Sequence, residues 1–132
     1  MLGRNNAQFA IEFTTLIAFM FIIFLGFTAV ITTKILDAKE NERQQISENV
    51  AQLAKNEIEL AQSVSDGYNR NFTLPVKING NNYTISILDN REIVVNYLDK
   101  EYVTFLKGSI IGNLTAGKNS LRKNSGIVYV NT

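Results

Sequence analysis

An uninterrupted apolar run near the amino end constrains this chain more than any other feature. From Phe13 to Thr33 no side chain carries a formal charge. A helix of roughly 20 residues, rising about 1.5 Å per residue, crosses the hydrocarbon core of a bilayer, which is about 30 Å thick. The run is apolar on every side, as expected for a helix that faces lipid or the inside of a helix bundle. The sequence therefore predicts a transmembrane or filament-core helix over residues 13–33.

The composition bears on the class of function. The 132 residues include 13 basic and 12 acidic side chains, so the formal net charge of +1 predicts no bulk attraction to nucleic acid. The chain has no cysteine and no histidine, which removes thiol chemistry and the commonest metal ligand and general base. It also has no phosphate-binding loop, zinc-protease or serine-hydrolase motif. We therefore expect a protein that is not an enzyme, with no catalytic residue, cofactor or metal.

The residues on either side of the apolar run predict its orientation in the membrane and whether it is removed as a signal peptide. Arg4 and the amino terminus precede it, which by the positive-inside tendency puts the amino end in the cytoplasm and residues after about Lys34 outside. A signal peptide that is removed whole has an apolar stretch of about 7 to 15 residues and small residues at its cleavage site. Here the run is longer and continues into TKILDAKENERQQ without such a site. We expect the helix to be retained.

A charged segment without glycine or proline follows, over residues 37–66. Its apolar residues recur at mostly three- and four-residue steps, which place them on one stripe of a helix. The stripe comprises Ile46, Val50, Leu53, Ala54, Ile58, Ala61 and Val64. Gly67 is placed to end the helix in a left-handed cap. One helix is predicted over residues 8–66, amphipathic at 37–66; its part at 37–45 has almost no apolar face and is either solvated or covered by another subunit.

Residues 67–132 have the pattern of short antiparallel strands. The segment FTLPVKI, residues 72–78, alternates apolar and polar side chains, and Pro75 favours an edge strand or a bulge. A domain of about 65 residues buries only about 60% of its surface and is marginally stable alone, so we expect it to pack on the helix. Turns are predicted at Asn79-Gly80, Asp89-Asn90, Asp99-Lys100 and Asn124-Ser125-Gly126.

The predicted fold class is therefore α+β. A long N-terminal hydrophobic stalk helix is followed by a small antiparallel β-sheet head, which packs on the carboxyl-terminal half of the helix. Exposed tyrosine and asparagine side chains of this head either bind a surface or a sugar or are ordinary strand and turn residues.

One acid, Glu12, lies at the edge of the apolar run, where an ionised side chain is costly. Two ordinary interpretations exist. An acid near the amino end of a helix interacts with the macrodipole, which is worth about 0.3–1 kcal/mol. An interfacial side chain can also extend toward the lipid headgroups.

The stretch AQFAIEF, residues 7–13, resembles the processing and assembly motif of type IV pilin-like proteins, in particular archaeal prepilins with a class III signal peptide. Their pattern is Gln-x-Ser-x-Glu-Phe at the start of an apolar helix, preceded by a short basic leader that is cut immediately before the Gln. The matching residues are Gln8, Glu12 and Phe13, while Ala10 and Ala7 stand where Ser and Gly are usual.

The resemblance implies cleavage between Ala7 and Gln8 by a membrane aspartyl prepilin peptidase, which removes the leader 1–7. It implies a structural subunit of an archaeal type IV-like pilus, held in the cell membrane before assembly and part of an extracellular filament afterwards, for adhesion to surfaces. The implied partners are other copies of the chain in a homo-oligomeric helical filament, the prepilin peptidase and the pilus assembly platform. Glu12 and Phe13 are the implied assembly residues.

Physical chemistry supplies a reason for the acid in this motif. Cleavage before Gln8 creates a cationic amine about one helical turn from Glu12, in its own chain or on a neighbouring chain. Opposite unit charges about 4 Å apart attract by about 4 kcal/mol at an effective dielectric constant near 20, before desolvation is subtracted. Cleavage then acts as the switch for lateral docking.

Alternatives remain beside a major pilin. A minor pilin or a TadE-like pseudopilin also has a Glu-Phe pair before its membrane helix. A membrane-anchored extracytoplasmic binding module that does not polymerise requires Glu12 only to be interfacial. The Asn-x-Ser/Thr sequons at Asn71, Asn82 and Asn113 are either accidental or N-glycosylated in the outward head.

Overall fold

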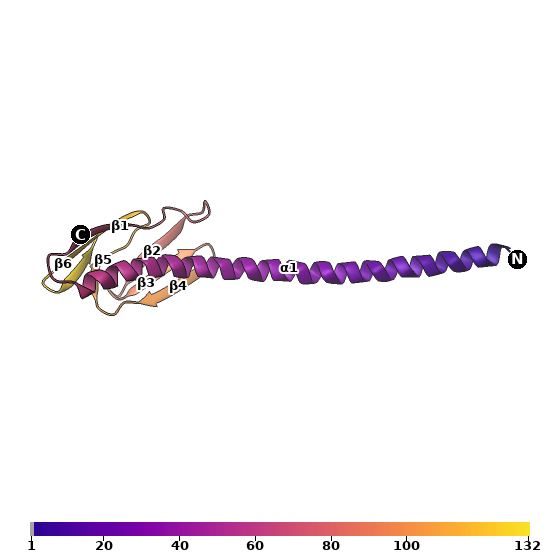
Figure 1. The fold of residues 1–132 in the computed structure, drawn as a ribbon, viewed down its shortest axis with the longest axis horizontal. Coiled ribbons are helices and arrows are strands. Elements are labelled where there is room, and N and C mark those ends of the chain that lie inside the picture. The colour runs from indigo at the N-terminus through magenta and orange to yellow at the C-terminus, as the bar shows by residue number, and fades with distance from the viewer. Residues whose placement is uncertain (1) are drawn as a thin grey trace. The chain divides into compact units, whose positions relative to one another are not determined.

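The computed structural model describes the backbone of residues 2–132 and the side chains from Asn5 onward. Met1 and the side chain of Arg4, both in the predicted leader, lie outside the described residues. The chain forms two compact units, Met1–Glu40 and Asn41–Thr132. One helix, α1 (Leu2–Ser63), contributes to both (Figure 1).

Helix α1 confirms the long N-terminal helix that the sequence predicts. Its sequence contains no proline, and after Arg4 its only glycine is Gly26, so nothing interrupts the ladder of backbone hydrogen bonds. The observed helix begins at Leu2 and ends at Ser63, whereas the predicted helix spans residues 8–66.

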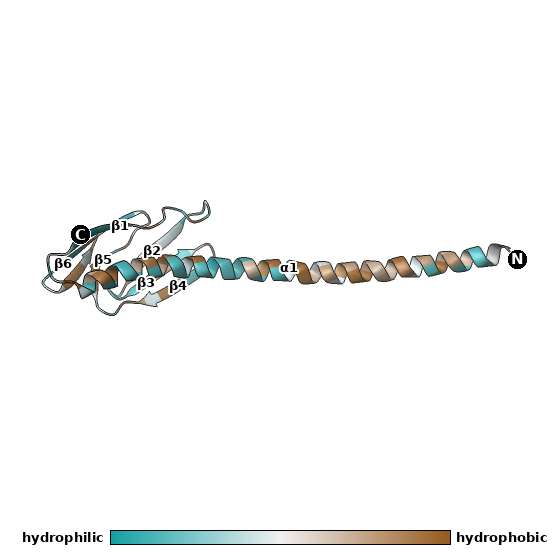
Figure 2. Cartoon of the chain, viewed as in Figure 1, coloured by the Kyte–Doolittle hydropathy of each residue, from teal (hydrophilic) through white to brown (hydrophobic). Residues whose placement is uncertain are grey.

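The unit Met1–Glu40 consists of helix in its described part, and its side chains from Asn5 to Glu40 are exposed. The apolar ones form a long brown stretch of α1 in Figure 2. The helix is long and apolar enough to cross a membrane, and none of its most apolar window is buried within the molecule. A helix of this composition needs lipid or other apolar helices around it.

The unit Asn41–Thr132 contains the end of α1 and two sheets (Figure 1). In the described residues a four-stranded sheet has the order β1-β6-β7-β5 and a three-stranded sheet the order β2-β3-β4. The strands are β1 (Asn69–Thr73), β2 (Tyr83–Leu88), β3 (Glu92–Tyr97), β4 (Lys100–Phe105), β5 (Ile110–Gly112), β6 (Lys118–Asn124) and β7 (Ile127–Val130). The α+β class with a largely antiparallel head is confirmed, and the pair β5–β7 is parallel.

One stripe of α1 packs against the two sheets and forms part of the core. Its buried residues are small or medium-sized, which lets the strands approach the helix backbone: Ser47, Val50, Ala51, Ala54, Ile58 and Ala61. The prediction that Leu53 belongs to this stripe is wrong, because its side chain is 53% exposed. Leu53 lies about 100° around the helix from Ala54, and Ala51 occupies the core position in its place.

The sheets bury an apolar face against this stripe. The fully buried side chains of the strands and of the loops between them include Leu74, Ile93, Val95, Leu106, Ile110, Leu114, Leu121, Val128 and Val130. They form one core cluster with the helix stripe. The head is thus stabilised by the helix, as its small size requires.

The strand predicted over residues 72–78 is wrong in its position, because β1 spans Asn69–Thr73 and shares only Phe72 and Thr73 with it. β1 ends at Thr73, and Val76 is 67% exposed where the alternation places it inside. The amide of Leu74 donates to the carbonyl of Gly117 at 2.8 Å, which continues the pairing of β1 with β6 by one residue, and Pro75 then has no N–H to donate. The alternating pattern therefore ends at the proline.

The predicted turns hold, with one shifted by a residue. Asn79-Gly80 joins the bridge between Ile78 and Asn81 with positive φ at both positions, as a type I′ turn requires. The turn between β3 and β4 is centred on Leu98-Asp99, because Lys100 already pairs with Tyr97. The remaining two turns, after Leu88 and after Asn124, also contain residues with positive φ.

The carboxyl end of α1 is capped differently from the prediction. Gly67 has φ +91°, but its amide donates to the carbonyl of Lys123 on β6 at 3.0 Å rather than to the helix. The ammonium group of Lys123 donates to the carbonyl oxygens of Gln62, at 2.7 Å, and Val64, at 2.6 Å. A cation at the carboxyl end of a helix also interacts favourably with the macrodipole.

Polar side chains fasten other points of this unit. Arg43 of α1 forms an ion pair with Asp99 at 2.9 Å. The pKa of the Asp99 carboxyl is lowered, mainly because it accepts a hydrogen bond from the backbone amide of Asp99 itself. The nearby Arg43 guanidinium lowers it further. The phenol of Tyr83 donates to the carbonyl of Pro75, and burial raises the pKa of this tyrosine.

Candidate functional site

The predicted processing and assembly residues lie together in α1, within the unit Met1–Glu40. Ala7, Gln8, Glu12 and Phe13 are all exposed. The side-chain amide of Gln8 donates a hydrogen bond to Oε1 of Glu12, one helical turn away, at 3.2 Å. The two polar residues of the motif thus contact each other, and the Ala7–Gln8 bond joins two exposed residues of the helix.

Glu12 lies at a border between polar and apolar surface. From Asn5 to Thr33 it is the only formally charged residue. A hollow on one side of it is lined by Asn5, Gln8 and Phe9. The hollow on its other side is almost wholly apolar and is lined by Ile11, Glu12, Thr15, Leu16 and Phe19. A cationic group of a partner that approached Glu12 would therefore arrive with apolar surface next to it.

The hydroxyl groups of the apolar segment are satisfied by the helix itself. Each donates to a backbone carbonyl three or four residues earlier, at 2.8 to 2.9 Å, from Thr14, Thr15, Thr28, Thr32 and Thr33. An unpaired hydroxyl is costly in an apolar medium. The segment can therefore lie in lipid or among other helices without an unsatisfied threonine, which the sequence alone did not establish.

The aromatic side chains around Glu12 offer contact area rather than chemistry. Phe9 and Phe13 are 69% and 64% exposed. Side chains of this size bury a large apolar area when a partner covers them. Gly26, further along, has no atom within 4 Å of where a Cβ would lie, so nothing in the described chain requires a glycine there.

No protein-family model, curated protein or solved structure matches the chain. Membership of the pilin-like group therefore stays a prediction that depends on residues 7–13.

The predicted sequons differ in their surroundings. Asn71 lies on β1, and Asn82 precedes β2; both are exposed. Asn113 has a structural role, because its side-chain oxygen accepts hydrogen bonds from the amides of Ile87, at 2.6 Å, and Leu114, at 3.0 Å. It thereby joins the free edge of β2 to the segment after β5. Glycosylation stays a prediction for all three asparagines.

Among the described residues no cluster of three His, Cys, Asp or Glu side chains has the geometry to hold a metal ion.

The prediction from sequence missed Lys123, which caps α1 from 61 residues away in the sequence. It also missed the polar face shared by β1 and β6, whose alternation of polar side chains was the available signal.

Proposed function

We propose that this chain is the structural subunit of an archaeal type IV-like pilus. A prepilin peptidase cuts it between Ala7 and Gln8, the assembly platform extracts it from the membrane, and its N-terminal helix joins a homo-oligomeric helical filament. The extracellular filament then serves adhesion to surfaces. The observation that supports this proposal best is the exposed, all-round apolar helix whose only charged residue from Asn5 to Thr33 is Glu12.

Of water, lipid and a core of neighbouring helices, the helix core suits this segment best. In water the exposed phenylalanine, leucine and isoleucine side chains of the segment are unfavourable, at about 25 cal/mol for each Å² of apolar surface. In lipid the apolar surface is accommodated, but ionised Glu12 is costly. A filament core of neighbouring helices accommodates both, provided that a cation meets the carboxylate.

The amine released by processing is the nearest source of that cation. In the unprocessed chain Gln8 contributes only a neutral amide to Glu12. After cleavage the same residue would carry a positive α-amine, and hydrogen bonds between charged groups are about twice as strong as neutral ones. Assembly would therefore follow processing, since the pairing group does not exist before it.

Surface filaments provide the test. The cells that express the chain are sheared, and the released filaments are imaged and their subunits identified by peptide mass spectrometry. We expect this chain to be the dominant component, as a major subunit requires. A small fraction of the chain in the filaments would assign it as a minor pilin or TadE-like pseudopilin.

A membrane-anchored binding module is the second candidate, because the head presents a polar hollow of its own, described below. In that case the chain stays with the membrane fraction after shearing, with its amino-terminal leader intact. This outcome would contradict the filament proposal while leaving the binding properties of the head in place.

A further inference from the structure

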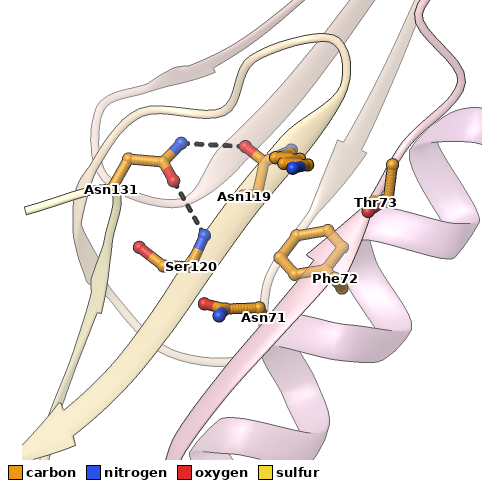
Figure 3. Close-up of a pocket in the computed structure, with 7 residues that line it drawn as sticks. Asn71, Phe72, Thr73, Asn119, Ser120 and Asn131 are labelled. Atoms are coloured by element: carbon orange, nitrogen blue, oxygen red, sulfur yellow. Dashed lines mark hydrogen bonds between the residues drawn. The ribbon is translucent and has the colours of Figure 1, made fainter.

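A polar hollow lies on the head where β1 runs beside β6 (Figure 3). It has a volume of about 440 Å³ and is lined by Asn71, Phe72, Thr73, Lys118, Asn119, Ser120 and Asn131. β1 is an edge strand of its sheet, so one side of the hollow is open to solvent.

The floor of the hollow is fixed by a network of amide hydrogen bonds. The side chain of Asn131 donates to Oδ1 of Asn119 at 2.8 Å and accepts from the amide of Ser120 at 2.8 Å (Figure 3). Asn119 is 3% exposed and donates to the carbonyls of Thr115 and Gly117. These amides have their partners within the chain, so they hold the shape of the hollow.

The rim carries polar groups without partners. Asn71 pairs with Ser120 and Thr73 pairs with Lys118, and the alternation of side chains along a strand places all four on one face. Within the described residues, no hydrogen bond or ion pair engages these four side chains. Phe72, which also lines the hollow, lies between Asn71 and Thr73, and its partly buried side chain packs against the core.

The surroundings favour an anionic ligand. From Tyr102 to Thr132 the chain has four basic residues and no acidic residue. Lys118 lines the hollow, and Arg122 follows on the same face of β6, above the ring of Tyr129. No acidic residue lies on β1, β5, β6 or β7 themselves. The acids that reach this sheet from α1 and from the segment after it are engaged elsewhere, Glu57 with Arg70 at 3.0 Å and Asp66 with the amide of Gly126 at 2.8 Å, and neither lines the hollow.

We propose that this hollow binds an acidic saccharide, such as a chain of uronic acid residues. The hydroxyls of Thr73 and Ser120 and the amide of Asn71 match the hydroxyls of a sugar ring. The ammonium of Lys118 matches a uronate carboxylate. A nucleic acid fits less well, since the face has two cations and its tyrosine is already covered by Arg122.

An acidic saccharide would be the ligand through which the proposed pilus adheres to surfaces. The inference rests on the proposed function only for this adhesive role. Binding by the hollow does not require polymerisation. A chain that kept its leader would contradict the filament proposal and leave this binding measurement unchanged. A chain that formed filaments without binding the sugar would do the reverse.

The test uses the full chain in detergent micelles, with trigalacturonic acid as the probe and maltotriose as the uncharged control. Titration calorimetry measures affinity, and amide chemical shifts locate the site. We expect trigalacturonate to bind, to shift the amides of Asn71, Thr73 and Ser120, and to bind less tightly as salt is added. Maltotriose is expected to bind much more weakly.

Matched variants separate the hollow from general charge. Lys118→Gln is expected to weaken trigalacturonate binding about tenfold or more, since it removes a charge-assisted contact. Lys77→Gln removes an exposed lysine outside the hollow and is expected to change nothing. Ser120→Ala deletes a rim hydroxyl while keeping the backbone amide that Asn131 holds, and is expected to weaken binding by a smaller factor.

Several results would overturn the inference. They are the absence of trigalacturonate binding, equal effects of Lys118→Gln and Lys77→Gln, and self-association of the head that Lys118→Gln abolishes without sugar. A glycan on Asn71 in the chain from its native cells would also overturn it, because the attached sugar would cover the hollow.

Discussion

The side-chain amide of Gln8 lies 3.2 Å from the carboxylate of Glu12 and donates a hydrogen bond to it. A neutral amide is thus the intramolecular partner of the acid before processing. If cleavage adds a charged amine at Gln8, the strongest partner of Glu12 changes from a side chain to a chain terminus. The predicted role of Glu12 in assembly depends on that exchange.

Removal of the acid is expected to separate processing from assembly. Glu12→Ala should still be cleaved before Gln8, because Glu12 is not one of the two residues that the cut bond joins, yet form at least tenfold fewer filaments. The lost attraction is about 4 kcal/mol before desolvation. Filament yield and the mass of the membrane-bound chain measure the two steps.

Two further variants are controls for this result. Glu12→Asp keeps the charge on a shorter side chain and should retain part of the assembly. Glu42→Ala removes an exposed acid elsewhere on α1 and should assemble normally. Normal filaments from Glu12→Ala would show that the pairing role is wrong.

Gly26 is expected to matter between chains rather than within one. Glycine costs about 1 kcal/mol relative to alanine inside a helix, and beyond the adjoining helix backbone and the two neighbouring residues no described atom lies within 4 Å of where a Cβ would be. Gly26→Leu should therefore leave helix content and membrane insertion intact and reduce assembly, with Gly26→Ala intermediate. Circular dichroism and filament yield are the readouts. Assembly of Gly26→Leu at the wild-type level would exclude a close helix contact at this point.

Lys123 is expected to stabilise the end of α1. Lys123→Met removes two charge-assisted hydrogen bonds to the carbonyls of Gln62 and Val64 and should lower the free energy of unfolding by about 1.5–3 kcal/mol. Lys77→Met, at an exposed lysine, should lower it by less than about 0.5 kcal/mol. Urea unfolding of the chain in detergent measures both, and equal effects would contradict the capping role.

Two glycines allow backbone strain to be separated from steric conflict. A Cβ on Gly112, whose φ is +110°, would lie 1.9 Å from the carbonyl oxygen of Val130, whereas a Cβ on Gly126, φ +80°, meets nothing within 4 Å. Gly112→Ala should therefore open the parallel β5–β7 pair, at a cost above about 3 kcal/mol. Gly126→Ala should cost about 1 kcal/mol. The reverse order in thermal unfolding would contradict the geometry of this pair.

Local patterns predicted the features that depend on neighbouring residues. The helix follows from an unbroken run of helix-compatible residues, and the turn at Asn79-Gly80 follows from residues that accept positive φ. Contacts between distant residues were not predictable in this way. The cap from Lys123 joins atoms 61 residues apart, and the preference for Ala51 over Leu53 in the core depends on where the sheets lie.

The candidate site residues also divide into those that are contiguous in the sequence, which were predicted, and those that only the fold brings together. Residues 7–13 were recognisable because their motif is contiguous in the sequence. The hollow at β1 and β6 brings Asn71 next to Ser120, and only the register of the two strands reveals that pairing. The structural use of Asn113, which the sequence presents as a third sequon, also depends on the distant amide of Ile87.

The amino-terminal mass of the chain in sheared surface filaments tests the central claim most directly. We predict that the filament subunit begins at Gln8, with residues 1–7 absent and a free or modified α-amine on that glutamine. An intact leader beginning at Met1, on chain recovered from the cell surface, would contradict a processed filament subunit.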